Sequence, residues 1–101
     1  MSVTITLEAD IKPGERETLL SLLKRLLPET KVYKGFISIS IHIEKNSSHL
    51  LFFEKWESIP DYEAYLSWRQ DTGVMNQLGA LFSESPTIRY YNTEDVRVIH
   101  P

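Results

Sequence analysis

The stretch FISISIHIE (residues 36–44) is followed, after a short polar loop, by HLLFFEKWE (residues 49–57). In the first stretch an isoleucine recurs at every second position, and this period-two alternation is typical of a strand with one buried face. The second stretch is apolar at positions that point to both faces. The loop between them contains Asn46, Ser47 and Ser48, which favour tight turns. The two stretches therefore predict a β-hairpin.

The length of the hairpin loop decides which side chains share a face, because a slip of one residue exchanges the two faces. If the loop spans 45–49, His42 and Glu54 lie on the side of Trp56. If it spans 45–48, His42 instead joins Leu51 and Phe53. We favour the first register, because it gathers the isoleucines with Leu51 and Phe53 under the helices.

The rest of the chain alternates between strand and helix patterns. The expected elements are a strand at 2–10, a helix at 15–27 ended by Pro28, a helix at 59–69 capped by Ser58, a further helical stretch between Gly73 and Pro86, and a strand at 87–92. This order is the split β-α-β or ferredoxin-like arrangement, an α+β fold with helices on one face of an antiparallel sheet. We expect a single domain over 1–101, with its core at 3–92 and a C-terminal arm at 93–101. Residues 96–99 form either a short fifth strand or part of that arm.

Composition excludes several classes of function. A net charge of -3 over 101 residues lacks the basic surface that nucleic acid binding requires. The sequence has no long apolar run and no leader pattern, so we expect no membrane span and a cytoplasmic location. Cysteine is absent, and the three histidines are not spaced as a metal site, so no metal is expected. No glycine-rich nucleotide motif is present, and we expect no cofactor.

One face of the sheet is left without a helical cover, and the second hairpin strand is apolar on both sides. Exposed aromatic surface of this kind is rare in monomers. Burial of each large side chain contributes roughly 1.5–3 kcal/mol, so a second copy packed sheet to sheet would form a closed barrel. We therefore expect a homodimer, that is, a dimeric α+β barrel. The alternative is that the C-terminal tail covers the strand.

The residues that could carry chemistry are a group of aromatic and titratable side chains. Histidine is a side chain that commonly takes a proton near neutral pH, and His42 is the candidate base. Glu54, the second candidate catalytic residue, lies on an inward strand face and is expected to pair with Arg69 or Arg89. The candidate substrate-binding residues are Trp56, Tyr62, Tyr65, Trp68 and Arg69.

The motif Glu54-x-Trp56-Glu57-Ser58, with Gly35 before the second strand and Pro86 leading to Tyr90 and Tyr91, resembles the antibiotic biosynthesis monooxygenase (ABM) superfamily over about residues 3–92. The resemblance implies dimeric α+β barrels with a pocket between each subunit's sheet and helices. Quinone-forming members oxidise phenols or anthrones with O₂ and use neither metal nor flavin. In the resemblance, Trp56 and Tyr62 match a pocket tryptophan and tyrosine.

The sequence also departs from two branches of that superfamily. Phe52 stands where the quinone-forming type has asparagine. The haem-degrading branch uses an asparagine on the first strand and a histidine on the second helix, and both are missing here, so haem oxygenation is rejected. The resemblance thus implies a cofactor-independent monooxygenase that acts with O₂ on a small or medium aromatic, quinol-like or enolisable substrate. The alternatives are a non-catalytic dimeric small-ligand-binding domain and a proton-transfer enzyme of the muconolactone isomerase type.

Overall fold

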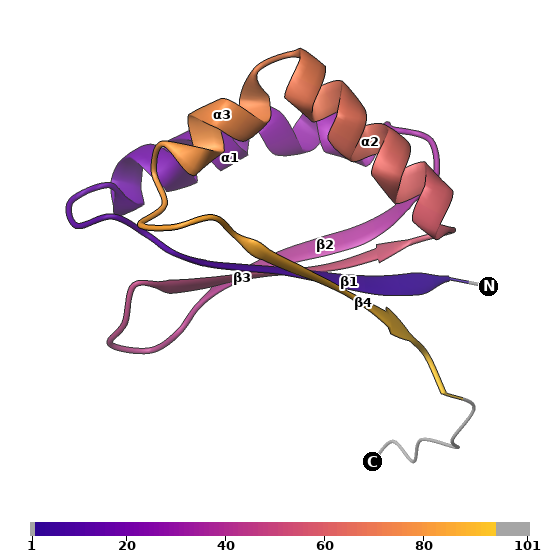
Figure 1. Ribbon diagram of the computed structural model, residues 1–101, viewed down its shortest axis with the longest axis horizontal. Coiled ribbons are helices and arrows are strands. Elements are labelled where there is room, and N and C mark those ends of the chain that lie inside the picture. The colour runs from indigo at the N-terminus through magenta and orange to yellow at the C-terminus, as the bar shows by residue number, and fades with distance from the viewer. Residues whose placement is uncertain (1, 95–101) are drawn as a thin grey trace.

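The computed structural model describes residues 2–94 as a four-stranded antiparallel sheet with three helices packed against it (Figure 1). In chain order the elements are β1 (Val3–Asp10), α1 (Arg16–Lys31), β2 (Phe36–Ile43), β3 (His49–Trp56), α2 (Ile59–Asp71), α3 (Val74–Gly79) and β4 (Thr87–Asn92). The predicted α+β ferredoxin-like fold is confirmed. The short strand or arm expected at 96–99 lies outside the described residues.

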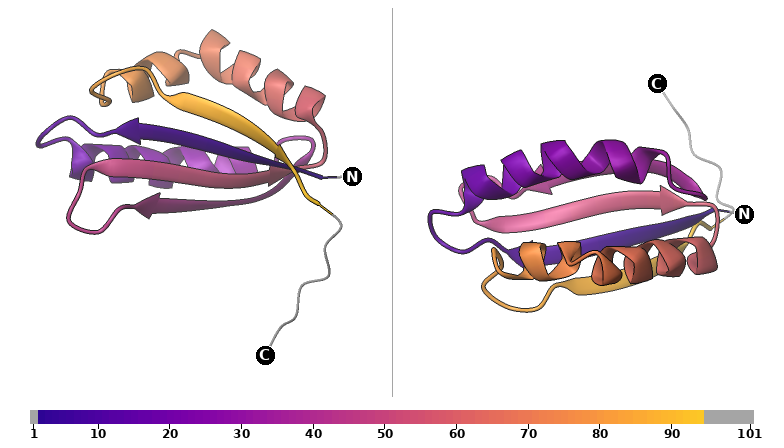
Figure 2. Two further views of the ribbon diagram at one scale, coloured as in Figure 1. Left: turned by 60° about the horizontal axis from the view of Figure 1, so that its bottom comes forward. Right: turned by 90° about the horizontal axis from the view of Figure 1, so that it is seen from above.

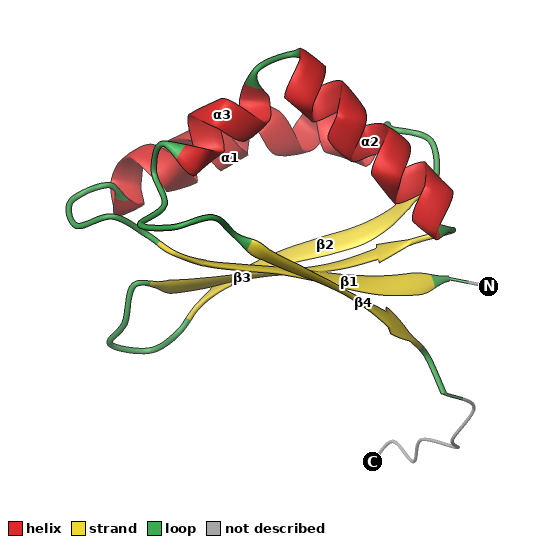
Figure 3. Cartoon of the chain, viewed as in Figure 1, coloured by secondary structure: helices red, strands yellow, loops and turns green. Residues whose placement is uncertain are grey.

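The sheet has the strand order β2-β3-β1-β4, so the two most buried strands, β3 and β1, lie at its centre. The helices cover one face and leave the other open, as the two views in Figure 2 and the secondary-structure colouring in Figure 3 make plain. Ile5 of β1 and Leu50 of β3 point toward the helices and are fully buried. The position of the core therefore follows from the alternation along these two strands.

The hairpin between β2 and β3 has a loop at 45–48, closed by a backbone hydrogen bond of 2.8 Å between residues 44 and 49. The ladder pairs Ile41 with Phe52 and His42 with Leu51. Cross-strand partners share a face, so Ile39, Ile41 and Ile43 lie with Phe52 under the helices, and His42 lies with Leu51 on the open face. The register favoured from the sequence is wrong, because the loop is one residue shorter than that register needs.

Helix α1 continues beyond Pro28, which was expected to end it, and runs to Lys31. A proline inside a helix removes one backbone hydrogen bond. The turn after it is anchored from α2, because the hydroxyl of Thr30 accepts a hydrogen bond from Arg69 Nη2 (3.1 Å) and lies 2.7 Å from the hydroxyl of Tyr65. The prediction from Pro28 is therefore wrong for a tertiary reason: side-chain bonds from another helix hold the last turn.

Helices α2 and α3 begin where the sequence predicted. The Ser58 hydroxyl accepts a hydrogen bond from the backbone N–H of Asp61 (3.2 Å), which confirms the predicted N-terminal cap. Gly73 separates the two helices with a φ of 81°, a left-handed conformation that favours glycine. None of the helices in residues 2–94 has the length and apolar character needed to cross a bilayer.

The open face of the sheet carries both apolar and charged side chains. Phe53 is 41% exposed and Tyr91 is 46% exposed. Beside them Arg89 forms an ion pair with Glu8 (2.6 Å). The hydroxyl of Thr6, in the middle of this face, is buried and has no hydrogen-bond partner among the described residues. The described chain therefore leaves some apolar rings of this face exposed to solvent and one of its hydroxyl groups without a hydrogen bond.

Candidate functional site

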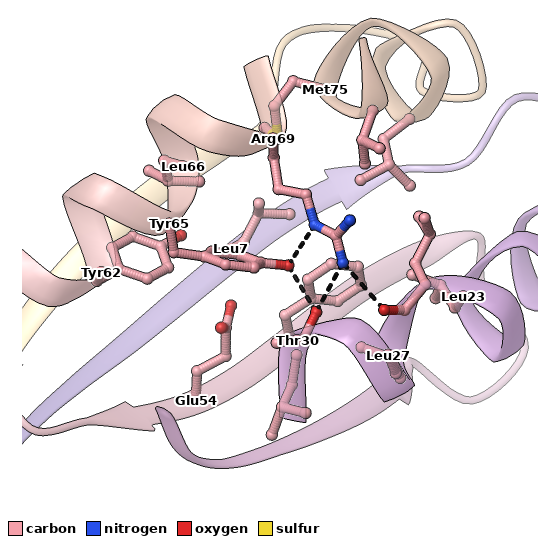
Figure 4. Close-up of a pocket in the computed structure, with 15 residues that line it drawn as sticks. Leu7, Leu23, Leu27, Thr30, Glu54, Tyr62, Tyr65, Leu66, Arg69 and Met75 are labelled. Atoms are coloured by element: carbon pink, nitrogen blue, oxygen red, sulfur yellow. Dashed lines mark hydrogen bonds between the residues drawn. The ribbon is translucent and has the colours of Figure 1, made fainter. Parts of the chain in front are cut away.

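A cavity of about 40 Å³ lies between the sheet and the helices (Figure 4). Its walls are mainly aliphatic side chains from the strands and from all three helices, and Leu7, Leu23 and Met75 are examples. Its polar lining consists of Thr30, Glu54, Tyr62, Tyr65 and Arg69. The structure thus brings together four of the seven residues predicted for the site.

Glu54 reaches this cavity because it lies on the helix-facing side of β3, and its side chain is only 3% exposed. Burial raises its pKa to about 7, because the charged form loses hydration, while a hydrogen bond from the indole Nε1 of Trp56 (3.0 Å) acts to lower it. A group with this pKa is about half ionised at neutral pH. It can take a proton from a ligand and return it.

The predicted pairing of Glu54 with an arginine is wrong. Arg69 donates instead to Glu29 on α1 (2.9 Å), and Arg89 pairs with Glu8 on the opposite face of the sheet. Within residues 2–94, no cation forms an ion pair with Glu54. Among the residues that the structure describes, Glu54 is therefore a buried carboxyl group without an ion-pair partner.

Arg69 is 2% exposed, and its guanidinium links α2 to the last turn of α1. It donates to the hydroxyl of Tyr65 (2.9 Å), to the carbonyl of Leu26 (2.9 Å) and, as described above, to Thr30 and Glu29. These bonds use most of its donors. Arg69 therefore holds the two helices together, and its predicted contact with a substrate stays a prediction.

The aromatic residues of the predicted site divide into two groups. Tyr62 and Tyr65 line the cavity, and burial raises the pKa of Tyr62, which favours its neutral form. Trp56 is fully buried behind Glu54, and Trp68 stacks on Tyr33 with ring centroids 5.3 Å apart. Neither tryptophan lines the cavity, so their contact with a ligand also stays a prediction.

His42 does not join this site. It is exposed on the open face, where its Nε2 lies 2.8 Å from the hydroxyl of Ser40. The sheet separates it from the cavity. The favoured register placed His42 on the same face as Glu54 and Trp56, and this grouping is wrong, because Glu54 and Trp56 lie under the helices and His42 does not. Its role as a base stays a prediction that the arrangement does not support.

Sequence analysis missed two groups of interacting residues. One is the contribution of Glu29 and Thr30, for which the only signal was that residues after Pro28 keep a helical pattern. The other is His49 on the open face, whose ring nitrogens lie 2.9 Å from Glu8 and 3.0 Å from Asp10. The hydrogen bond with Glu8, followed by that with Asp10, raises the pKa of His49. These partners are distant in sequence, so only the sheet register could have revealed them.

In the part of the chain that the structure describes, no three His, Asp or Glu side chains gather as a metal site. The residues that line the cavity can perform acid–base chemistry, through Glu54, and can hold an apolar ligand.

The fold and the cavity define an α+β domain of the ferredoxin-like class with an internal helix–sheet site. The sequence model of the antibiotic biosynthesis monooxygenase family matches residues 2–70, and the chain belongs to that family. A comparison with curated proteins finds no match.

Several solved structures share this fold. A conserved protein from Methanosarcina mazei superposes with a TM-score of 0.83 at 17% identity, covering 93% of this chain and 94% of that one. A monooxygenase from the gene ActVA-Orf6 of Streptomyces coelicolor, in complex with the ligand nanaomycin D, gives 0.81 at 14% identity, covering 98% and 93%. An antibiotic biosynthesis monooxygenase described as a candidate from Deinococcus radiodurans gives 0.79 at 17% identity and covers both chains fully. At these identities the similarity establishes the fold.

Proposed function

We propose that the protein is a cofactor-independent monooxygenase that binds a small aromatic, quinol-like or enolisable substrate in the helix–sheet cavity. The observation that carries the proposal is Glu54, a buried carboxyl group with a pKa of about 7 that lines an otherwise mainly apolar cavity. Membership of the ABM family supports the oxidative half of the proposal.

In the proposed reaction, Glu54 first takes a proton from a C–H or O–H group of the bound substrate. The resulting anion gives one electron to O₂, and the substrate radical and superoxide combine to form a peroxide. Glu54 returns its proton to the peroxide, which then loses water to leave a carbonyl group on the substrate. One O₂ is consumed for each water and each new carbonyl, and two hydrogens leave the substrate.

The cavity shapes this reaction in two ways. Its aliphatic walls exclude water, which strengthens electrostatic interactions and protects the anion. Its volume of about 40 Å³ is far below the roughly 300–1,000 Å³ of typical organic ligand sites. An aromatic substrate therefore requires the walls to move apart. The short helix α3, joined to α2 at Gly73, supplies Val74, Met75 and Leu78 to the lining and is the element that we expect to move.

The proposal includes a homodimer formed through the open face of the sheet. The exposed rings of Phe53 and Tyr91 support it, because a second sheet would cover them. The occupant that we propose is a second copy of this chain.

Oxygen uptake with a panel of anthrones and hydroquinones tests the enzymatic proposal. Glu54→Gln preserves the shape of the side chain but cannot take a proton, and we expect kcat to fall by about 10²-fold or more. Glu57→Gln is the matched control, since Glu57 lies three residues further along the chain and is exposed. Equal uptake by the wild type and Glu54→Gln, after subtraction of spontaneous oxidation, would refute the role of Glu54.

A proton-transfer enzyme of the isomerase type is the second candidate, because the same buried carboxyl could move a proton within a substrate without oxygen. Exchange of a lactone α-proton for deuterium under anaerobic conditions, lost in Glu54→Gln, would favour it. A ligand-induced thermal shift without turnover of any substrate would instead indicate a binding domain.

A further inference from the structure

The indole of Trp56 is positioned to act on Glu54 and not on a ligand. The two residues are two apart on β3 and share its helix-facing side, and Trp56 Nε1 donates to Glu54 Oε1 over 3.0 Å. Glu54 lines the cavity, whereas Trp56 is fully buried outside the lining. Figure 4 shows the Glu54 side chain rising from the sheet toward the helix that carries Tyr62 and Tyr65.

The indole itself is held firmly in place. Four aromatic rings surround it, with centroids at 5.0 Å for Tyr65, 5.5 Å for Phe36, 5.6 Å for Tyr62 and 6.4 Å for Tyr33. Three of the four approach edge to face, the favoured geometry for aromatic pairs. The direction of its N–H bond is therefore fixed by packing on several sides.

An indole N–H can only donate, so the oxygen that faces it must accept in both protonation states of Glu54. Oε1 accepts from Trp56, and the structure gives the Glu54 side chain no other hydrogen bond within residues 2–94. In a carboxylic acid the carbonyl oxygen is the better acceptor, so the indole bond to Oε1 favours the protonated form of Glu54 that carries its hydrogen on Oε2. This leaves Oε2 as the oxygen that can exchange a proton with a molecule in the cavity.

We propose that Trp56 is a positioning residue: its N–H occupies Oε1 of Glu54, so that the exchangeable proton is carried on Oε2 and presented to the cavity. This inference rests on the proposed role of Glu54 as the base. The titratable groups that face Glu54 from α2 are Tyr62, Tyr65 and Arg69, and the cation among them is bonded to α1. The indole of Trp56 is thus the group that stabilises the ionised form of Glu54.

Two measurements on the intact protein test this inference. In the wild type, the ¹⁵N–¹H resonance of the Trp56 indole should move with pH with the same midpoint as the ¹³C carboxyl resonance of Glu54, because the two groups share a hydrogen bond. In Glu54→Gln, the chemical shift of the Trp56 indole should no longer change with pH around that midpoint. An indole resonance that does not respond while Glu54 titrates would overturn the inference without any mutation of Trp56.

The second measurement removes the donor. In Trp56→Phe, we expect the carboxyl pKa of Glu54 to rise by about one unit, and the pH profile of turnover to shift upward with it. Phe36→Leu is the matched control, since it weakens packing against the indole but keeps its N–H, and it should leave the pKa in place. An unchanged pKa in Trp56→Phe, or an equal rise in Phe36→Leu, would refute positioning by the N–H.

The outcomes also separate this inference from the proposed function. If the two resonances titrate together but oxygen uptake does not depend on Glu54, the proposed monooxygenase role fails, and with it the catalytic meaning of the pair. If uptake depends on Glu54 while the indole resonance is insensitive to pH, the proposed function stands and positioning by Trp56 fails.

Discussion

Replacing Glu54 by glutamine is expected to stabilise the protein at pH 8 and to leave its stability almost unchanged at pH 4. Burial raises the pKa of Glu54 from an ordinary 4.5 to about 7, so the folded state binds this proton more tightly than the unfolded state does. The stabilisation from the bound proton is complete below pH 4.5. It is lost as the pH rises through 7.

The size of the effect follows from the two pKa values. Their difference is 7 − 4.5, and each unit corresponds to about 1.4 kcal/mol, so ionisation of the buried carboxyl costs the folded state about 3 kcal/mol by pH 8. Glutamine has no proton to lose and can still accept the Trp56 hydrogen bond. The variant should therefore exceed the wild type in free energy of unfolding by about this amount at pH 8.

The assay is urea denaturation followed by far-ultraviolet circular dichroism at pH 4, 5, 6, 7 and 8. Protein concentration is held constant, because a dimer gains stability with concentration. Since other groups also titrate, the result to compare is the difference in free energy of unfolding between Glu54→Gln and wild type at each pH. The exposed Glu57→Gln should show no such pH-dependent difference. Parallel stability curves for Glu54→Gln and wild type would refute the reasoning, because Glu54 would then have the same pKa in both states.

Two further predictions concern the helix contact and the open face. Arg69→Met removes the hydrogen bonds that tie α2 to Thr30 and its neighbours, and urea denaturation should show that the free energy of unfolding falls by about 3 kcal/mol. Arg69→Lys should restore little of this stability, because an ammonium group cannot reproduce the planar fork of the guanidinium. Full stability in Arg69→Lys would contradict this account. Phe53→Lys places a charge on the open face, and sedimentation equilibrium should show at least a tenfold weaker dimer, whereas a monomeric wild type would exclude the dimer altogether.

Much of the fold could be predicted from alternation and turn chemistry alone. The isoleucines of β2, the cap at Ser58 and the bend at Gly73 are local signals, and each predicts its element correctly. The end of α1 could not be predicted locally, because the last turn depends on side-chain bonds from a helix some forty residues away. The register of the hairpin was predicted wrongly for a related reason. Alternation shows which residues of one strand share a face, but it does not show which face of the neighbouring strand lies on the same side of the sheet.

The candidate site was predicted in composition but not in arrangement. Tyr62, Tyr65, Glu54 and Arg69 do meet at one cavity. The pairing of the charges could not be inferred, because the acid that Arg69 binds lies beyond a proline that was expected to end the helix. His42 was grouped with Glu54 and Trp56 only through the register, and the shorter loop instead places Glu54 and Trp56 with the isoleucines, on the face opposite His42.

Strand β3 also carries two titratable side chains that lie on opposite faces of the sheet. Glu54 points toward the helices and His49 toward the open face, and the pKa of each is raised in the folded chain. Both groups therefore favour folding in their protonated forms, and both contributions fade as the solution becomes more alkaline. The proposed base, by contrast, is competent only after Glu54 has lost its proton. In the proposed mechanism, turnover therefore increases with pH over the same range in which the folded state loses stability, and both trends originate from side chains of β3.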